Sequence, residues 1–527
     1  MSAIITDQFR ILNANNFVNS VQDTDNSYYV FLGLTNPKEN GFGRSDEWNI
    51  NTPAPSDSFS YRRHAGDTMM FGKKVSSANI RRLIRRIEWV QGTRYEIYRD
   101  DYSASNPSPN SSATRLYDAN YYVVTSELKV YICIDNGSTG SNPLGNVSQD
   151  EPTFEGTEPS KAGNSGDGYV WKYLFTVPSS DTIKFDSTEF ITVPNNWSTS
   201  TDAQIRAVRE NGNSNINSNQ IKHIFIENSG NKYAPDVVGA EVDIVGDGTG
   251  GRARIDIEDG KITNVTVSAG GKGYTWGRVD LSTYSNNADI KAKLIPIIPP
   301  ARGHGDDIYS ELGTDKVLLY ARFDDSTKDF PVDSTFSQVG IVKNPTKIDS
   351  DVVYTDNTFS SLQAIKLQEF SNASVPPKIG EEITQKLTIP PNDGKVAKGY
   401  VSSYDETTRV LKYFRDRSLY FNNTTFDHTD EVGVNTTGRI YQFETGSTIN
   451  DINGSSSGFS GKVEIAFSGI TTNPSGAQLI NLGTRFQAGL SDSEINKGSG
   501  QIIYLDNRPE INRSLRQKED IKIVLEF

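Results

Sequence analysis

The sequence has very little cysteine and no excess of basic residues, and each shortage excludes a class of protein. Cys133 is the single cysteine among 527 residues, so no disulfide can form within the chain and we expect folding in a reducing compartment. The net charge of −13 argues against a nucleic-acid surface, because such a surface needs excess Lys and Arg to displace counterions from phosphate.

Long apolar runs and targeting signals are also missing. No stretch approaches the ~18 consecutive apolar residues of a membrane-spanning helix. The first ten residues lack the basic start and apolar core of a signal peptide. We therefore expect a soluble chain that folds in a cytoplasm and does not insert into a membrane.

Patterns that would hold a metal ion or a cofactor are scarce. With one cysteine, the common structural zinc sites are excluded, and no pair of histidines has zinc-ligand spacing. The acidic stretches 23–26 and 324–325 lack the twelve-residue calcium loop, so solvated turns are expected there. We expect no cofactor and no metal. The four histidines are His64, His223, His304 and His428.

Two short motifs look catalytic but stand in the wrong setting. Residues 246–251 satisfy G-x-G-x-x-G, but the alternating stretch 252–257 predicts a strand where a dinucleotide site needs a helix. Residues 454–458 satisfy G-x-S-x-G within a Gly/Ser-rich loop, and no histidine follows them to complete an α/β-hydrolase triad. We therefore predict a tight turn at 246–251 and a loop at 454–458, and we do not expect an enzyme. Carboxylates that only the fold brings together stay possible as a glycan-hydrolase site.

What the sequence does have is aromatic residues in short runs between turn-forming residues. The 24 Tyr and 24 Phe indicate real cores, since each buried ring removes ~150–250 Å² from water. Gly, Ser, Thr and Asn separate short runs of Val, Ile, Tyr and Phe, which predicts a mainly β chain. The length suggests roughly three domains. Strands are expected at 28–32, 121–124 and 130–134.

One helix is predicted, over residues 77–89. Apolar residues recur there at i, i+3, i+4 and i+7, which is the stripe of an amphipathic helix. Four arginines would then share the opposite side, as a solvated basic face or as an interface that docks on an acidic partner. These candidate interface residues are Arg81, Arg82, Arg85 and Arg86.

Two regions resemble internal repeats of small β units. The pattern of 224–226, Gly230 and Tyr233 recurs 41 residues later as 265–267, Gly271 and Tyr274. We interpret 221–295 as an all-β module in which glycines supply positive φ at the bends and each tyrosine covers the end of its hairpin. A second β-rich region covers 356–483, where 380–396 weakly resembles 446–463.

Three well-separated stretches, together with weaker ones in the same order, resemble one family: the baseplate wedge protein of T4-like contractile-tailed phages, its eighth gene product. The weaker stretches are 3–21, 43–58, 85–95, 130–135, 191–194, 319–323 and 519–527. The three main ones are Gly166-Asp-Gly-Tyr-Val-Trp-Lys-Tyr-Leu-Phe175, Phe330-Pro331 through Asn344-Pro345, and Ile502-Ile-Tyr-Leu-Asp-Asn-Arg-Pro509.

The resemblance implies a layered β-sandwich core with helix-bearing loops, enlarged by two inserted all-β modules. The expected parts are 1–205 (core), 206–304 (first insertion), 305–355 (core), 356–485 (second insertion) and 486–527 (C-terminal strands of the core). Within the core, 169–175 would form a strand with one wholly aromatic face buried in the sandwich rather than in a subunit contact. Pro509 is expected to end one strand, and 521–527 to form another.

The resemblance also implies a function. The expected role is a structural, non-enzymatic subunit of the tail baseplate wedge in the virion, assembled in the host cytoplasm. Its partners would be other wedge subunits and a second copy of itself, and not nucleic acid. A receptor- or glycan-binding fibre or spike protein is the alternative, suggested by the Gly/Tyr modules. A tail-associated glycan hydrolase is the third possibility.

Overall fold

The computed structural model describes most of the chain, which divides into two compact units. Unit 1 comprises residues 1–18, 81–318 and 524–527, and unit 2 comprises 19–80 and 319–523. The expected features at 43–46, 330–331, 446–449 and His428 lie outside the described residues. The described residues are 5–34, 47–212, 220–284, 289–324, 335–368, 375–415, 441–445, 451–473, 478–513 and 517–527.

The described chain is mainly β and sandwich-like, with all named strand pairs antiparallel, as the sequence predicts. The division into core and insertions stays a prediction. Most or all of each of these helices lies in unit 1: α1 (Asp7–Gln22), η2 (Leu116–Asp118), α3 (Ser179–Phe185), η3 (Trp197–Thr199), α4 (Ala203–Gly212) and α5 (Ile308–Leu312). Its strands are β3 (Ile80–Arg85), β4 (Tyr122–Val124), β5 (Lys129–Asn136), β6 (Ser160–Lys161), β7 (Tyr169–Thr176), β8 (Phe190–Val193), β9 (Ile224–Asn228), β10 (Val237–Gly246), β11 (Thr249–Glu258), β12 (Lys261–Lys272), β13 (Gly277–Val279) and β14 (Lys293–Pro296).

The aromatic strand β7 is the centre of the largest core of unit 1. It lies in a sheet of order β4-β5-β7-β6, after a bend in which Gly166 and Gly168 have φ of +71° and +87°. The expected aromatic face is confirmed as core, since its four rings are at most 2% exposed. The opposite face is covered as well, because Lys172 and Leu174 are fully buried. The four rings belong to Tyr169, Trp171, Tyr173 and Phe175.

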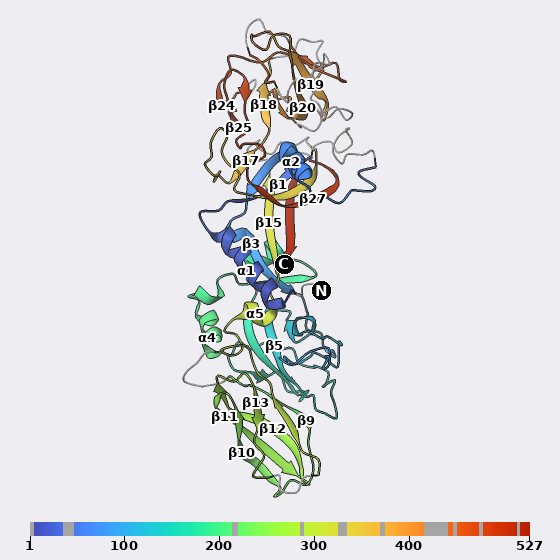
Figure 1. Cartoon of the computed structure of the whole chain (residues 1–527), viewed down its shortest axis with the longest axis vertical. Helices are drawn as coiled ribbons and strands as arrows, with labels where there is room; N and C mark the ends of the chain where they lie inside the picture. Colours follow the sequence, from blue (N-terminus) through green and yellow to red (C-terminus); the bar gives the residue numbers. More distant parts are fainter. Residues whose placement is uncertain are drawn as a thin grey trace. The chain divides into compact units, whose positions relative to one another are not determined.

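Strands β9 to β14 form the β module expected over 221–295, built around a core of its own (Figure 1). Its sheets have the orders β12-β11-β10-β13 and β14-β9. The repeat is visible in the backbone: Gly230 and Gly271 have φ of +66° and +62°, and a Cβ on either would meet the ring of the tyrosine three residues later. Residues 246–251 turn from β10 directly into β11, so the tight turn predicted there is confirmed.

The helix expected over 77–89 is wrong, because Ile80–Arg85 forms strand β3 after a short 3-10 turn, η1. Both faces of β3 are covered: Ile80, Leu83 and Ile84 are at most 2% exposed. A strand buried on both faces can place apolar residues at helical spacing, so the pattern alone does not separate the two. β3 pairs with β8, and the unit 1 ends of β15 (Lys316–Asp324) and β28 (Lys518–Glu526) complete the sheet.

Unit 2 contains a five-stranded sheet of order β17-β2-β1-β16-β27, a seven-stranded sheet of order β23-β22-β19-β20-β21-β18-β26, and the pair β24-β25. Helix α2 (Phe59–Thr68) begins where the Ser58 hydroxyl accepts the Tyr61 N–H, as an N-cap does. Residues 454–458 connect the paired strands β22 and β23, which agrees with the loop expected there. The other elements of unit 2 are η1 (Ser77–Asn79), β1 (Tyr28–Gly33), β2 (Met69–Lys74), β16 (Thr335–Lys343), β17 (Thr358–Ser360), β18 (Gln363–Lys366), β19 (Glu382–Lys386), β20 (Val396–Asp405), β21 (Val410–Phe414), β22 (Ile452–Gly454), β23 (Ser460–Gly461), β24 (Gly469–Thr472), β25 (Ile480–Phe486), β26 (Leu490–Ser491) and β27 (Gln501–Asn512).

The expectation that Pro509 ends a strand is also wrong. β27 continues through Pro509, and its register with β16 shifts between Asn507 and Ile511. A bulge on an edge strand removes the need for the missing N–H, which is why proline is tolerated there. The C-terminal strand expected at 521–527 is confirmed as β28.

The glycine–tyrosine repeat predicts a large difference between two nearby alanine substitutions. Gly271 and Gly273 both have positive φ, so an alanine costs ~1–2 kcal/mol at either position. A Cβ at Gly271 would also lie 2.5 Å from the Tyr274 ring and 2.7 Å from backbone atoms, whereas Gly273 faces open space. Gly271→Ala should therefore lower the stability of β11 and β12 by about 1–3 kcal/mol more than Gly273→Ala. Amide hydrogen exchange of both strands measures this, and equal effects would contradict the crowding at Gly271.

The buried Lys172 predicts an unusual pH dependence. Desolvation by burial lowers the pKa of Lys172 from 10.5 to about 8, although its Nζ donates to Thr157 O (2.6 Å) and Asn211 Oδ1 (3.1 Å). Between these pH values the unfolded chain binds more protons than the folded chain, so stability rises with pH. The difference in unfolding free energy between wild type and Lys172→Met should change in favour of wild type by roughly 2 kcal/mol from pH 7 to pH 9.5.

Denaturant titrations of both proteins across this range make the measurement. Subtracting Lys172→Met removes the contribution of tyrosines, which are common to both chains. Parallel curves for the two proteins would show that Lys172 keeps its proton in the fold.

Candidate interaction site around strand β3

The four candidate arginines lie on or directly after β3, and the chain itself supplies partners for each. Arg81 makes a bidentate ion pair with Asp181 of α3, with Nε–Oδ2 of 2.7 Å and Nη2–Oδ1 of 2.9 Å. Its guanidinium also lies 5.1 Å from the centre of the Phe185 ring. A planar fork on a carboxylate fixes orientation as well as charge, so Arg81 ties β3 to α3.

Arg82 is the most buried of the four arginines, with 3% of its surface exposed. Its Nε donates to Asn15 Oδ1 of α1 at 2.6 Å, and its Nη1 donates to the carbonyl and side-chain oxygens of Asn195 at 3.3 Å. The guanidinium stacks 4.2 Å from the Tyr309 ring centre. Burial lowers the pKa of Arg82, and the nearby Tyr309 and Asp307 oppose that shift. Arg82 therefore fastens α1, β8 and α5 around β3.

Arg85 and Arg86 continue the pattern toward the end of the strand. Arg85 Nη2 donates to Ala119 O at 2.7 Å, and the Arg85 carbonyl accepts the Tyr122 hydroxyl at 2.9 Å. Among the described residues, the buried Nε of Arg85 has no hydrogen-bond partner. Arg86 pairs with Glu88 at 2.8 Å and Asp186 at 3.2 Å, both largely exposed carboxylates.

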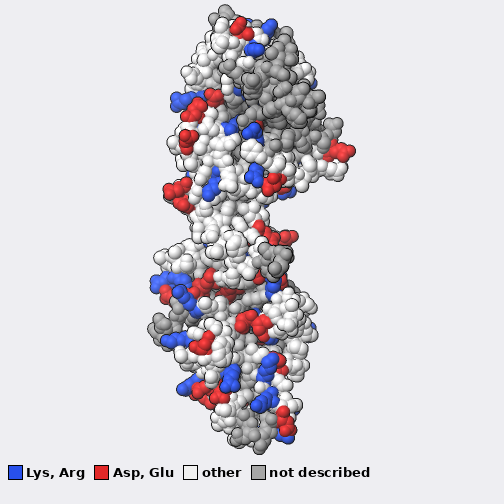
Figure 2. Space-filling model, viewed as in Figure 1, with Lys and Arg blue, Asp and Glu red and all other residues white. Residues whose placement is uncertain are grey.

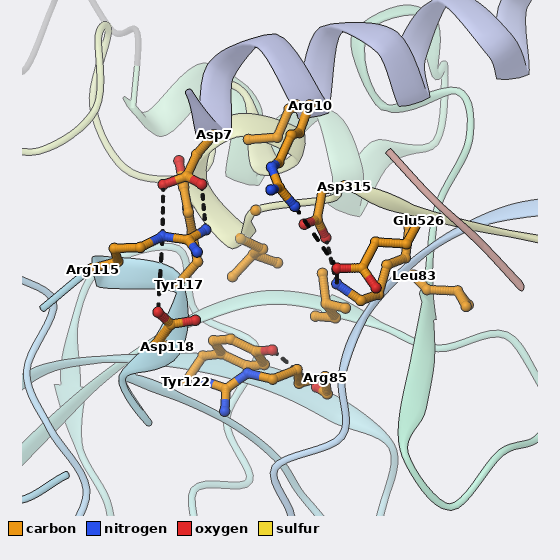
Figure 3. A pocket seen from close by; sticks show the side chains of 15 residues that line it. Asp7, Arg10, Leu83, Arg85, Arg115, Tyr117, Asp118, Tyr122, Asp315 and Glu526 are labelled. Carbon is orange, nitrogen blue, oxygen red and sulfur yellow. Dashed lines mark hydrogen bonds and ion pairs between the residues drawn. The ribbon is translucent and has the colours of Figure 1, made fainter. Parts of the chain in front are cut away.

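Arg85 also lines a pocket of about 110 Å³ that gathers charges from distant parts of unit 1 (Figure 3). Arg115 forms a bidentate pair with Asp7 of α1 and lies 3.8 Å from Asp118. Across the pocket, Lys316 pairs with Asp315 at 2.9 Å and with Glu526 at 3.4 Å. Each of these carboxylates therefore has a cation beside it, which suits a structural junction.

Burial and nearby charges shift the titration of this pocket. Desolvation raises the pKa of Tyr117 to about 12, and the nearby Asp7 adds to the shift. The Tyr117 hydroxyl donates to Ser310 O at 2.6 Å and stays protonated at neutral pH. Burial lowers the pKa of Arg115, but its bond with Asp7 and the charge of Asp118 raise it more strongly, so the net shift is upward. Tyr117 and Arg115 therefore both keep their protons at neutral pH.

The four arginines thus do not share one face of a helix. They lie on or directly after a strand, with side chains on both of its sides. The sequence singled out the arginines but missed their partners, because Asn15, Asp181 and Asn195 lie 67 to 113 positions away. The buried residues Ile11, Ala14, Val18 and Val21 of α1 have helical spacing, but the exposed Phe9 and Leu12 hide that spacing in the sequence. A partner interface at these arginines stays a prediction.

On the face drawn in Figure 2, Lys and Arg side chains are interspersed with Asp and Glu over the described residues. Within the part of the chain that the structure describes, no three His, Cys, Asp or Glu side chains are placed to hold a metal ion. None of the described helices is both long and apolar enough to cross a bilayer.

Comparison with known proteins finds similarity to a phage protein over part of the chain. Residues 131–234, from β5 to the turn after β9, match the family described as Bacteriophage T4, Gp8. Baseplate wedge protein gp8 of Enterobacteria phage T4 is 28% identical over 220 residues, which cover 36% of this chain and 60% of that protein. Over these matched parts the chain is similar to the Gp8 baseplate wedge protein of phage T4. It is longer than that protein, which is consistent with the expected insertions.

The Gp8-matched segment contains the parts of unit 1 that hold β3 in place. It includes the aromatic strand β7, helix α3 with Asp181, and strand β8. It ends at residue 234, inside the segment 206–304 that the sequence predicts as an insertion. The alignment spans 60% of the T4 protein's length, so its role comes to this chain only as a proposal.

The acidic residues Asp181, within α3, and Asp186, directly after it, predict unequal effects on stability. Asp181 is 4% exposed and Arg81 19%, so Asp181→Asn removes the negative charge of a largely buried bidentate ion pair. This substitution should lower the unfolding free energy by about 2–4 kcal/mol. Asp186 is 67% exposed, and Asp186→Asn should change it by less than about 1 kcal/mol. Urea unfolding with hydrogen exchange of β3 and β8 compares them, and equal values would refute the clamping role of Asp181.

Proposed function

We propose that this chain is a structural subunit of a contractile-tail baseplate, where it joins neighbouring wedge proteins without making or breaking covalent bonds. The observation that carries the proposal is the match of residues 131–234 to the Gp8 family, supported by the similarity to the T4 wedge protein. In this proposal the protein acts in the virion, is assembled in the host cytoplasm, and binds no nucleic acid.

The packing of unit 1 suits such a role. The matched segment supplies an aromatic core around β7, and the arginines of β3 contact α3 within that segment and α1 and α5 outside it. Interiors of this density transmit force instead of deforming, which a subunit needs when its assembly rearranges. Obligate interfaces in such assemblies often bury more than ~2,000 Å². The chain would reach that area through contacts with a second copy of itself and with other wedge subunits.

The candidate arginine interface is part of the same proposal. Arg86 has a side chain 23% exposed, and its partners Glu88 and Asp186 are 61% and 67% exposed. Exposed ion pairs contribute little to folding, so an acidic partner protein could take over Arg86 without destabilising β3. Arg82 has no such freedom, because it is buried among α1, β8 and α5.

The proposal predicts a defined assembly behaviour. Light scattering of the purified protein should give twice the 58.2 kDa chain mass, and mixing it with the other wedge proteins of the same virus should give a stable complex. Arg86→Glu should weaken that complex at low salt, while Asp186→Asn, which keeps Arg86, should not.

Three results would contradict the proposal. A trimer would favour a fibre or spike protein, and a mixture in which no wedge protein co-elutes would remove the joining role. Tail baseplates that antibodies to this chain fail to label would exclude the location. If Arg86→Glu assembles like wild type, only the interface at β3 is refuted.

A further inference from the structure

One tryptophan of the β module stands apart from the others. The chain has five tryptophans, and Trp48, Trp171 and Trp197 are at most 1% exposed. Trp276 is 55% exposed, directly before β13. A tryptophan that stays exposed loses the stabilisation that burying its large apolar ring would give. An exposed indole of this kind indicates a binding surface.

The turn that carries Trp276 is fixed from the outer side by Asp247. The carboxylate of Asp247 accepts the backbone N–H of Thr275 at 3.0 Å and of Trp276 at 3.2 Å, and the Thr275 hydroxyl at 2.5 Å. Three bonds from one side chain hold two consecutive residues in one conformation. The indole is therefore presented on a rigid backbone, so that less entropy is lost when a ligand binds.

The same turn is anchored from below by Tyr274, the second tyrosine of the repeat. Its hydroxyl donates to Ile244 O at 2.8 Å and accepts the Gly251 N–H at 3.1 Å. Its backbone N–H donates to Gln220 Oε1 at 2.9 Å. Tyr274 is 3% exposed, so consecutive aromatic residues point to opposite environments, one into the core and the other into solvent.

The surroundings of Trp276 are polar. Because side chains alternate along a strand, Trp276 and Arg278 lie on the face opposite the buried Val279. Arg278 stands opposite Val245 of β10, which is 40% exposed. Farther along the same face, exposed ion pairs join Arg252 to Asp243 and Arg254 to Glu241. One flat ring and one small apolar side chain thus sit beside hydrogen-bond donors and acceptors of both signs.

This combination fits a saccharide better than a protein. A stable protein contact needs ~800 Å² on each partner with an apolar centre, whereas one indole with Val245 offers a small fraction of that area. A sugar ring has one face of C–H groups, which packs on the indole, and a rim of hydroxyls, which can bond to guanidinium and carboxylate groups. We propose that the outer face of β10 and β13 around Trp276 binds a saccharide, with the sugar's C–H face on the indole.

The test uses the full-length protein and an array of bacterial lipopolysaccharide, capsule and peptidoglycan fragments. Wild type should bind at least one saccharide class with a Kd of roughly 0.1–10 mM. The bound fragment should reduce iodide quenching of tryptophan fluorescence, because Trp276 is far more exposed than the three buried tryptophans. Trp276→Ala should weaken binding by at least about tenfold.

Val238→Ala is the matched control. Val238 is an exposed apolar residue of the same sheet, 83% exposed at the start of β10, and its removal should leave saccharide binding unchanged. Hydrogen exchange of β10 to β13 verifies that both variants keep the fold. The inference is overturned if no saccharide binds, if Trp276→Ala binds like wild type, or if only wedge proteins protect Trp276 from iodide. It is independent of the baseplate assignment, which the assembly experiments test.

Discussion

The burial of the aromatic strand β7 is the interaction on which unit 1 depends. Trp171 stacks on Tyr169 with 5.3 Å between ring centres, and Tyr95 meets Trp171 edge-on at 5.8 Å. The Tyr169 hydroxyl accepts the Tyr95 N–H at 2.9 Å and donates to Asn146 O at 2.9 Å, so the polar end of the ring is satisfied inside the core. Packed rings whose hydroxyls all have hydrogen-bond partners can adopt few other arrangements. The loops around the strand are fixed for this reason.

The elements that follow β7 in the chain hold β3 in place. Helix α3 begins three residues after the strand ends, and its Asp181 holds Arg81 of β3. Strand β8 then pairs with β3, whose Arg82 reaches α1 and the Tyr309 ring. Arg81 and Arg82 of β3 therefore act as internal clamps of unit 1. This is consistent with a protein whose proposed task is to hold its shape between neighbours.

Some of this architecture could be predicted from the sequence, and the reason is local. The strands β1, β4, β5 and β7 consist largely of apolar and aromatic residues with Gly, Asn or Asp at or near one end, and such signals need no distant partner. The Gly271–Tyr274 repeat and the turn at 246–251 were equally accessible, because positive φ and tight turns are properties of a few consecutive residues.

The predictions from sequence are wrong where contacts between distant residues determine the local structure. β3 was assigned to a helix because a strand buried on both faces can imitate helical spacing, and only its pairing with β8 settles the matter. Pro509 continues its strand because a bulge on the edge strand β27 accommodates it. The clamp residues Asn15, Asp181 and Asn195 are ordinary polar residues in the sequence, and nothing local distinguishes them from solvated ones.

The proposed wedge role rests on residues 131–234, which match the Gp8 family. A cryo-EM map of the tail from the virus that encodes this chain tests it most directly. If the proposed role is right, every baseplate wedge contains density for the β4-β5-β7-β6 sheet, and this density contacts other wedge proteins. A map in which the complete wedge contains no such density, or in which the chain is found only in fibres, would contradict it.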